Sequence, residues 1–490
     1  MWHVAVDLGA SGGKIFLGRI QNDSLVIEEV HRFDNRPIQA DGRYCWDVTH
    51  IYHEVVRGLE KAEEEASEID SLGVDTWGLD FGFMKGGKLI RNPYSYRDPE
   101  LASTIEDILE EVPRKSIFTA TGINHWNVTN SLWQYHYLSR KEPKALQESD
   151  RIVMIPQLIS SMLGGRICGE ETIASTTQML DPISRTWATE LLCALELPIE
   201  KLPEVEEPGT KIGVLKEEVS KKIGSRPDIL LPASHDTAAA VAGMPLEEGN
   251  RAFLSTGSWF ILGAELEEPC LTDEAFEIEA SNEMGVEGTS RFLKNINGFF
   301  LLEECRKRWR KRNQIHEYGK LVDEASKAKA FGPLIDPDDE SFTIKGDMTE
   351  KIASYCRGTG QEVPESEGEI SRCIFESLAA KTALTLEDLM EVSNVSSERL
   401  HLGGGGARNE LFCQMVSSAA RIPVYAEPVE AAAVGNILTQ AKARSEIGDI
   451  EEGRRLVEKS LEIRKYEPEK SEEWEEVKGK MRRLMRDLEV

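Results

Sequence analysis

The sequence predicts an α/β protein built from two domains. The chain has 490 residues, which is enough for two domains of ordinary size. Its composition, with 40% hydrophobic and 29% charged residues, is typical of a globular protein with ample core. Both halves open with a short apolar strand, a turn of small residues and a second strand, around residues 4–17 and 250–262. This repetition predicts a duplicated fold, with a boundary near residues 243–249 and domains at 1–244 and 245–490.

Charge and cysteine content exclude several classes of protein. A formal net charge of −28 argues against a nucleic-acid partner, because such proteins meet the phosphate backbone with excess Lys and Arg. The eight cysteines are scattered without metal-like spacing and indicate free thiols in a reducing compartment. No apolar run is long enough to span a bilayer, and the first residues lack the basic region of a signal peptide. We therefore expect a cytoplasmic protein with no membrane partner, and the sequence leaves a homo-oligomer open.

The first turn of the chain is a candidate phosphate site. Residues 3–8 predict a buried strand, followed by Gly-Ala-Ser-Gly-Gly-Lys at 9–14 and by further strands at 15–20 and 25–30. A turn between strands excludes the phosphate loop and the dinucleotide fingerprint, which both lead into a helix. Glycines let backbone N–H groups approach an anion, although an ordinary hairpin has the same composition. Asp7, at the end of the first strand, favours the phosphate interpretation because a carboxylate there can hold Mg²⁺ through water.

A cluster of acids and an aromatic residue follows the next predicted strand. Asp47 caps an expected helix over 47–66, and residues 69–74 form a strand. That strand ends in Asp-Thr-Trp-Gly-Leu-Asp at 75–80. Sugar sites combine carboxylates, which accept hydrogen bonds from hydroxyls, with an aromatic wall for the ring. A turn whose tryptophan packs in the core uses the same residues, so both interpretations stay open for this segment.

Residues 100–245 predict helices joined by polar loops. Helical stretches are expected at 105–111, 131–140 and 157–163, and the Pro/Glu/Gly-rich segment 203–213 is expected to be an exposed loop. The loop around His125 could line a cleft. Because no partner residue has metal-like spacing, this histidine is more typical of a structural residue than of a metal ligand.

The polar run Ser-His-Asp-Thr at 234–237 interrupts an apolar passage near the middle of the chain. A buried charge is costly unless it is paired or used, so Asp236 needs an explanation. One interpretation is a polar turn that caps a helix beginning near Thr237, because Asp or Ser before an alanine run is a common cap. The other is a catalytic carboxylate at Asp236, held at an element terminus between the two domains.

The second half repeats the small polar turn and adds a run of glycines. Residues 255–258, Ser-Thr-Gly-Ser, offer hydroxyl and N–H groups suited to a polyphosphate, or form a common hairpin. Residues 400–409 place four glycines between a predicted strand and an amphipathic helix, where they let a nucleotide lie against the backbone at a helix N-terminus. The basic run at 304–312 is expected to be a solvated helix face. An amphipathic helix is expected over 369–392, with Ile374, Leu378, Thr382 and Leu386 on one side, and terminal helices over 447–490.

Taken in order, these pieces resemble the FGGY family of carbohydrate kinases over nearly the whole chain. The resemblance is carried by Val-Asp-Leu-Gly-Ala-Ser at 6–11, Asp-Thr-Trp-Gly-Leu-Asp at 75–80, Tyr-Arg-Asp at 96–98, Ala-Ser-His-Asp-Thr at 233–237, Ser-Thr-Gly-Ser-Trp at 255–259, Lys-Asn-Ile-Asn-Gly at 294–298, Gly-Gly-Gly-Ala-Arg-Asn at 404–409 and Glu-Ala at 430–431. It implies two ribonuclease-H-like domains of the actin and hexokinase type, with ATP and a sugar in the cleft between them.

The resemblance also implies roles for individual residues. Asp236 would be the general base that takes the proton from the sugar hydroxyl. The sugar would be contacted by Gly78, His235, Asp236, Thr237 and Asn295. The acidic and aromatic cluster described above, Asp75, Trp77 and Asp80, would line the same substrate site. ATP would be bound by Ala10, Ser11, Gly12, Gly13, Lys14, Ser258, Glu303 and Gly405, with Mg²⁺ at Asp7.

The implied reaction is the phosphorylation of a ketose by Mg-ATP, with L-rhamnulose and its 1-phosphate as the first candidates. L-Fuculose, xylulose or another ketose or polyol is the alternative substrate. A non-catalytic actin-like protein that binds a nucleotide or a sugar is the alternative function. Four positions depart from the family's usual pattern, since Gly12 replaces a serine, Lys14 an arginine, Glu303 a glutamine and Asn297 an apolar residue. A lysine keeps the charge of arginine but not its bidentate fork.

Overall fold

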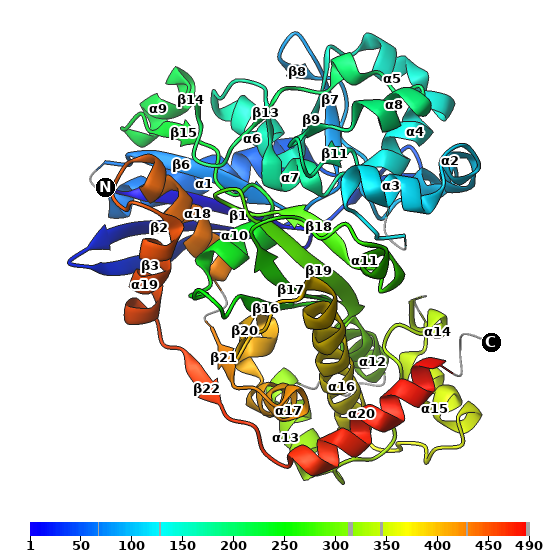
Figure 1. Cartoon of the computed structure of the whole chain (residues 1–490). Coiled ribbons are helices and arrows are strands. Elements are labelled where there is room, and N and C mark those ends of the chain that lie inside the picture. Colours follow the sequence, from blue (N-terminus) through cyan, green and yellow to red (C-terminus); the bar gives the residue numbers. More distant parts are fainter. Residues whose placement is uncertain (67, 127–128, 312–316, 344–345, 428–429, 487–490) are drawn as a thin grey trace. The chain divides into compact units, whose positions relative to one another are not determined.

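The computed structural model describes residues 1–66, 68–126, 129–311, 317–343, 346–427 and 430–486 (Figure 1). The chain divides into two compact units that alternate along the sequence. The first unit comprises Met1–Pro245, Glu265–Phe292 and Glu430–Leu461, and the second comprises Leu246–Ala264, Leu293–Val429 and Glu462–Val490. Two segments from the second half of the sequence therefore belong to the first unit.

A six-stranded mixed sheet forms the centre of the first unit, in the order β14-β15-β6-β1-β2-β3. Its strands are β1 (His3–Gly9), β2 (Gly12–Gln21), β3 (Ser24–Asp34), β6 (Ser71–Thr76), β14 (Lys211–Val214) and β15 (Asp228–Leu230). β1 pairs antiparallel with β2 and parallel with β6. The four strands predicted near the beginning of the chain are confirmed as β1, β2, β3 and β6, with β6 displaced toward its carboxyl end.

Helices cover both faces of this sheet, which explains why β1 is apolar along most of its length. On one face, Val4 and Val6 share a core with Ile51 of α1 (Val48–Glu65). On the other, Ala5 packs in a core with α10 (Asp236–Gly243) and α18 (Ala431–Ala443). Asp47 caps α1 as predicted, since its carboxylate accepts a hydrogen bond of 2.9 Å from the backbone N–H of His50.

The other predicted helices of the first half are confirmed as α2 (Ile105–Glu111), α4 (Ser131–Lys141) and α6 (Ile155–Leu163). The segment 203–213 is not the exposed loop that its composition predicts. It holds β13 (Val205–Glu206) and the start of β14, because Ile212 is buried in the core. The unit also contains β4 (Ile38–Ala40), β5 (Arg43–Cys45), β7 (Phe81–Lys85), β8 (Lys88–Leu89), η1 (Pro99–Ala102), α3 (Arg114–Thr121), α5 (Pro143–Glu148), β9 (Arg151–Met154), β10 (Gly169–Glu170), α7 (Glu171–Ser175), β11 (Leu180–Asp181), β12 (Thr186–Trp187), α8 (Thr189–Ala194), η2 (Ile199–Lys201), α9 (Glu217–Ile223), α11 (Asp273–Glu277), β18 (Ser281–Met284) and α19 (Ile450–Ser460).

The sheet of the second unit repeats the strand order of the first. From β22 to β19 it runs β22-β21-β20-β16-β17-β19, which corresponds strand by strand to β14-β15-β6-β1-β2-β3. These strands are β16 (Ala252–Thr256), β17 (Trp259–Leu266), β19 (Ser290–Asn297), β20 (Leu400–Gly404), β21 (Val424–Ala426) and β22 (Arg464–Tyr466). As in the first sheet, β16 pairs antiparallel with β17 and parallel with β20, and β21 pairs parallel with β20 and antiparallel with β22. The duplication inferred from the two similar turns is confirmed at the level of topology.

A long helix, α16 (Glu367–Ser393), forms the core of the second unit. The residues Ile374, Leu378, Thr382 and Leu386 are buried as predicted, but so are Ala379 and Ala383 on other sides of the helix. The helix is therefore enclosed rather than amphipathic. The unit also contains α12 (Phe300–Lys311), α13 (Tyr318–Lys327), α14 (Glu340–Thr343), α15 (Met348–Gly358), η3 (Gly405–Arg408), α17 (Glu410–Ala420) and α20 (Ser471–Arg486). The terminal segment 447–490 was expected to be helical, and it adds the strand β22 between α19 and α20.

All eight cysteines are free, as their scattered spacing predicts. No described helix is long and apolar enough to cross a membrane.

Direct backbone contact joins α10 to α18. A Cβ placed on Gly435 of α18 would lie 1.8 Å from the carbonyl oxygen of Ala239 in α10, and one placed on Gly243 would lie 2.2 Å from the carbonyl oxygen of Ala431. A side chain fits at neither position. Because Asp236 is the first residue of α10, this contact also sets the position of its carboxylate.

We expect Gly435→Ala to destabilise the protein by ~1–3 kcal/mol, because α10 and α18 must separate to admit the methyl group. Denaturant unfolding measures this loss. Gly319→Ala in α13 is the matched control, since a Cβ there meets nothing within 4 Å. That control is expected to gain ~0.5–1 kcal/mol from the lower entropy of the unfolded chain. Equal effects of the two substitutions would contradict the packing argument.

Candidate active site

The first candidate phosphate turn is a tight hairpin between β1 and β2. Gly9 pairs with Gly12, which leaves Ala10 and Ser11 as the two turn residues. Asn35 donates from its side-chain amide to the carbonyl oxygen of Gly9 at 2.8 Å, and this bond holds the turn against the sheet. The hairpin and phosphate interpretations of this sequence are therefore compatible, because the turn is a hairpin that presents small residues at its tip.

Two carboxylates lie side by side where β1 and β6 end. Asp7 is opposite Asp75 in the parallel ladder and opposite Lys14 in the antiparallel one. Asp75 is fully buried. Its Oδ2 accepts a hydrogen bond of 2.6 Å from the Asn436 side chain, whereas its Oδ1 has no hydrogen-bond partner in the described part of the chain.

Burial and neighbouring carboxylates raise the pKa values of Asp7 and Asp75. Burial raises the pKa of Asp7 to about 6, with Lys14 lowering it and the charge of Asp236 raising it further. Burial raises the pKa of Asp75 well above its usual range, and the charges of Asp7 and Asp236 add to that effect. The three acids therefore form one electrostatic group, in which the negative charges outnumber the positive charges nearby.

Asp236 is the first residue of α10, and its side chain is 31% exposed. Its Oδ1 accepts a hydrogen bond of 3.1 Å from the Thr237 hydroxyl and lies 3.4 Å from Nε2 of His235. Burial raises the pKa of Asp236, while the neighbouring His235 lowers it. The N-cap position belongs to His235, and no side chain makes a capping bond, so the helix-cap interpretation of Asp236 and Thr237 is wrong.

A residue that the sequence analysis missed, Glu170, holds the segment in front of α10. Its buried carboxylate accepts hydrogen bonds from the backbone N–H groups of Thr172, Ile173 and Ser234 at 2.9, 3.2 and 3.1 Å. The Thr172 hydroxyl in turn accepts a hydrogen bond of 3.1 Å from the N–H of His235. Glu170 therefore fixes the backbone that carries His235 and Asp236.

The residues at 77–80 form a turn whose polar groups point into the protein. The Asp80 carboxylate accepts hydrogen bonds from the indole N–H groups of Trp46 and Trp77 at 2.6 and 3.0 Å, and from the Gln134 amide at 2.8 Å. Trp77 is buried with its ring 4.1 Å from that of Trp46. Gly78 is half-buried between Trp77 and Asp80, whose side chains are buried. The accessible part of this turn is therefore its backbone at Gly78.

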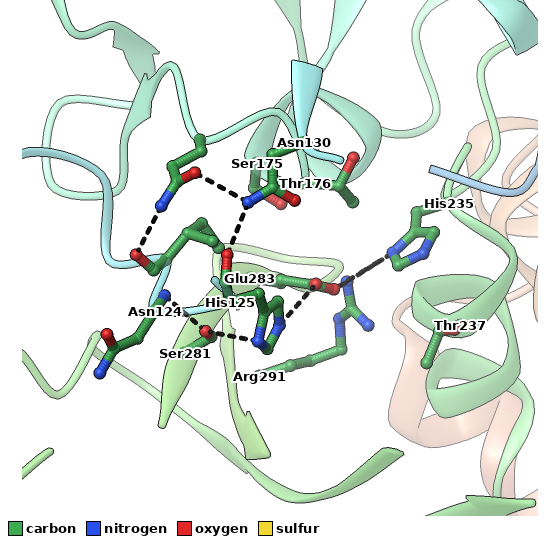
Figure 2. Close-up of polar contacts among 12 residues, drawn as sticks. Asn124, His125, Asn130, Ser175, Thr176, His235, Thr237, Ser281, Glu283 and Arg291 are labelled. Carbon is green, nitrogen blue, oxygen red and sulfur yellow. Dashed lines mark hydrogen bonds and ion pairs between the residues drawn. The ribbon is translucent and has the colours of Figure 1, made fainter. Parts of the chain in front are cut away.

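A buried network surrounds the side chain of His235 (Figure 2). Its Nδ1 lies 3.1 Å from Nη2 of Arg291 and 3.2 Å from Oε2 of Glu283, and these two residues form an ion pair of 2.9 Å. His125 lies farther along the same network, with Nε2 3.9 Å from Oε1 of Glu283 and Nδ1 3.3 Å from the Ser281 hydroxyl. No sequence pattern pointed to Glu283 or Arg291, because each is an isolated charged residue in a short strand of mixed composition and its partner lies on another strand.

The second unit brings together the second small turn and the run of glycines. The Thr256 hydroxyl donates to the carbonyl oxygen of Gly403 at 2.5 Å and accepts from the N–H of Gly406 at 2.8 Å. Gly404 has φ of 80°, and a Cβ there would lie 2.2 Å from the carbonyl oxygen of Thr256. Gly405 faces open space, so the glycine run combines a tight contact with an accessible backbone.

The remaining predicted residues of this unit have separate surroundings. Ser258 is exposed, and its carbonyl oxygen accepts hydrogen bonds from the N–H groups of Gly298 and Phe300. Glu303 is in the first turn of α12 and pairs with Arg306. Asn295 has a buried Oδ1 without a hydrogen-bond partner among the described residues. In the basic run at 304–312, Lys307 and Arg310 are exposed as predicted, whereas Trp309 is buried and Arg312 lies outside the described residues.

Comparison with known proteins decides the family. The model of the FGGY family of carbohydrate kinases, N-terminal domain, matches residues 2–243, and the model of its C-terminal domain matches residues 252–444. The chain belongs to the FGGY family of carbohydrate kinases. It is 40% identical to a rhamnulokinase of Bacteroides thetaiotaomicron, over 96% of each chain, and 34% identical to a rhamnulokinase of Bacillus subtilis, again over 96% of each.

Solved structures support the same fold. A gluconate kinase from Lactobacillus acidophilus has a TM-score of 0.81 at 16% identity, covering 99% of this chain and 97% of its own. Plasmodium falciparum glycerol kinase with ADP has a TM-score of 0.77 at 15% identity, covering 99% and 98%. As an FGGY kinase the chain is an ATP-using sugar kinase.

The carboxylates fit a magnesium ion of the kind that accompanies a nucleotide. No group of three or more His, Cys, Asp or Glu side chains in the described residues could hold a metal by itself. Mg²⁺ in phosphoryl-transfer enzymes usually takes one or two carboxylates and completes its shell with water and phosphate oxygens. The Asp7 carboxylate, which is only partly buried, has the chemistry of such a single ligand.

The Glu170 anchor predicts a pH dependence of stability. Burial raises the pKa of Glu170 to about 7, whereas an unfolded chain titrates this group near about 4.3. The folded protein therefore binds this proton more tightly, and the contribution of Glu170 to stability falls as the pH rises from about 4 to about 7. Glu170→Gln removes that fall. We expect the unfolding temperature of Glu170→Gln, relative to wild type, to increase between about pH 5 and about pH 8.

Thermal unfolding at several pH values tests this expectation. Glu190→Gln, at an exposed position of α8, serves as control and should keep a constant difference from wild type. A Glu170→Gln difference that is flat with pH, or that decreases as the pH rises, would contradict the assignment.

Proposed function

We propose that this chain is an ATP-dependent ketose kinase that converts L-rhamnulose to L-rhamnulose 1-phosphate. The observation that carries the proposal is the match over 95–96% of the chain to relatives named rhamnulokinase, at 30–40% identity. The geometry agrees, because a partly exposed carboxylate, Asp236, stands at a helix start with donors on one of its oxygens.

In this proposal Asp236 is the general base. Phosphoryl transfer to a hydroxyl needs a proton acceptor beside the acceptor oxygen and a positioned, charge-neutralised phosphate. The raised pKa of Asp236 makes its carboxylate a better proton acceptor than an ordinary aspartate. Thr237 and His235 lie on its Oδ1, which leaves Oδ2 for the sugar hydroxyl.

The sugar is held by side chains and backbone around this carboxylate. We propose contacts from Gly78, His235, Thr237 and, in the second unit, Asn295. Asn295 supports this role because its buried Oδ1 has no protein partner among the described residues and is suited to accept a hydroxyl. Asp75, Trp77 and Asp80, which are buried behind the turn, act by shaping the substrate region.

Nucleotide contacts are proposed for both small turns. In the first unit they come from the hairpin residues Ala10, Ser11, Gly12 and Gly13 and from Lys14, whose charge offsets that of phosphate. In the second unit they come from Ser258, Gly405 and Glu303. Asp7 would hold Mg²⁺, which neutralises phosphate charge when it is bound. Lys14, opposite Asp7 in the hairpin, keeps a positive charge next to that carboxylate.

A ketose panel tests the substrate. We expect L-rhamnulose to give the highest kcat/KM in a coupled assay of ATP consumption, with L-fuculose and xylulose lower. NMR of the product should show phosphate on O1. A different preferred ketose would overturn the substrate, and ATP turnover unaffected by every sugar would favour a non-catalytic binding protein.

The base assignment is tested by Asp236→Asn. The substitution keeps shape and removes the proton acceptor, so kcat should fall by ~10²–10⁴. The unfolding temperature should be unchanged or higher, because a carboxylate with a raised pKa opposes folding at neutral pH. Asp273→Asn is a matched control, since Asp273 is also the first residue of a helix, α11, and it should retain wild-type kcat. Near-normal kcat in Asp236→Asn would rule out the general base.

A further inference from the structure

The ion pair between Arg291 and Glu283 is enclosed in the first unit and has no part in the proposed contacts with sugar or ATP. The Arg291 side chain is 0% exposed and that of Glu283 is 8% exposed. Burial lowers the pKa of Arg291, whereas the charge of Arg291 holds the pKa of Glu283 well below its usual range. Nη1 of Arg291 has no hydrogen-bond partner among the described residues. A buried pair with an unsatisfied donor adds little net stability compared with apolar residues of the same size.

The contacts of this pair point to His235. Nη2 of Arg291 lies 3.1 Å from His235 Nδ1, and a guanidinium can only donate hydrogen bonds. In a neutral imidazole, the nitrogen that accepts from arginine must be the one without a proton, so the hydrogen is on Nε2. Glu283 also approaches Nδ1, with Oε2 3.2 Å away, but this approach is an ion-pair distance only, whereas the contact of Nη2 with Nδ1 has hydrogen-bond geometry.

The other ring nitrogen faces the proposed base. Nε2 of His235 lies 3.4 Å from Oδ1 of Asp236. With hydrogen on Nε2, the ring presents a donor to this oxygen and holds the carboxylate in one orientation. With hydrogen on Nδ1 instead, a nitrogen lone pair would face the carboxylate and repel it.

We propose that Arg291 and Glu283 are positioning residues for Asp236, because they hold His235 in the tautomer whose Nε2–H faces the carboxylate. This inference rests on the proposed role of Asp236 as general base. It assigns a task to two buried charges whose stabilising effect is small, and it explains why the network in Figure 2 ends at the residue that precedes Asp236. Glu283 orients Arg291, and Arg291 acts on the histidine.

The tautomer can be measured directly. Nitrogen NMR on protein labelled with ¹⁵N-histidine distinguishes a protonated from a bare ring nitrogen, and the His235→Gln spectrum identifies the signals of His235 among the nine histidines. We expect Nε2 to carry the hydrogen and Nδ1 to be bare. A hydrogen on Nδ1 alone would overturn the inference. This measurement does not depend on whether Asp236 is the base.

Kinetics separate positioning from structure. Arg291→Met should lower kcat by ~10–100-fold, the range known for the loss of a residue that orients a metal-binding histidine. Arg291→Lys, which keeps a charged donor, should recover most of that loss. The KM for ATP should stay within about threefold of wild type in both, since the network touches no proposed nucleotide contact.

A second variant keeps the test valid if Arg291→Met leaves Glu283 uncompensated and unfolds the protein. Glu283→Leu with Arg291→Met removes both charges, so this double variant should be as stable as wild type or more stable. It should nevertheless lose kcat to the same extent as Arg291→Met, because Nδ1 then has no donor. A stable double variant with wild-type kcat would overturn the inference.

Combining the double variant with Asp236→Asn shows whether the loss of kcat depends on the carboxylate of Asp236. Added to Asp236→Asn, the double variant should change the residual kcat by less than about threefold, since the group being positioned is already absent. A further loss of 10-fold or more would show that the pair acts elsewhere and would overturn the inference. If Asp236→Asn alone were near-normal, the proposed base would fail while the measured tautomer of His235 stood.

Discussion

Burial of like charges where β1 and β6 end is the constraint on which the rest of the first unit depends. Asp7 and Asp75 are neighbours in a parallel ladder, and the charge of Asp236 raises the pKa of both. Among the neighbouring cations, Lys14 lowers the pKa of Asp7 the most. Such a group opposes folding at neutral pH, since each carboxylate binds its proton more tightly in the folded protein than in the unfolded chain. Only a scaffold that is stable elsewhere can hold it.

That scaffold is made by backbone contacts and buried hydrogen bonds rather than by charge. The glycines of α10 and α18 let two helices touch at backbone distance, which places the first residue of α10. Asn436 of α18 reaches back to Asp75 and to the carbonyl oxygen of Gly73, and Glu170 holds the N–H of Ser234. The acids are thus kept close by neighbours that cannot move away without opening the core. This arrangement is expected where a site needs anionic ligands for a cation and a basic carboxylate in one place.

Local patterns predicted much of this arrangement, and long-range contacts decided the rest. The strands around the first turn and the cap at Asp47 follow from alternation and side-chain chemistry within a few residues, and they are confirmed. The repeated turn correctly indicated two sheets of one topology. By contrast, Asp75 meets its amide partner 361 residues later, and His235 meets Arg291 56 residues later. Nothing near either residue in the sequence specifies such a partner.

Errors in the prediction have the same origin. The segment 203–213 has the composition of a loop, but pairing in the sheet and burial of Ile212 make part of it a strand. Thr237 has the residue type of a cap, but the backbone of α10 begins two residues too early for it, and its hydroxyl bonds to Asp236 instead. In both cases a local preference is overruled by a contact with distant residues. Position in the fold, rather than residue type, therefore decides whether a polar residue in this chain caps, anchors or remains available for chemistry. By that criterion Asp80, whose oxygens are taken by three internal donors, is an anchor, whereas Asp236 has one oxygen with no protein donor in the described contacts.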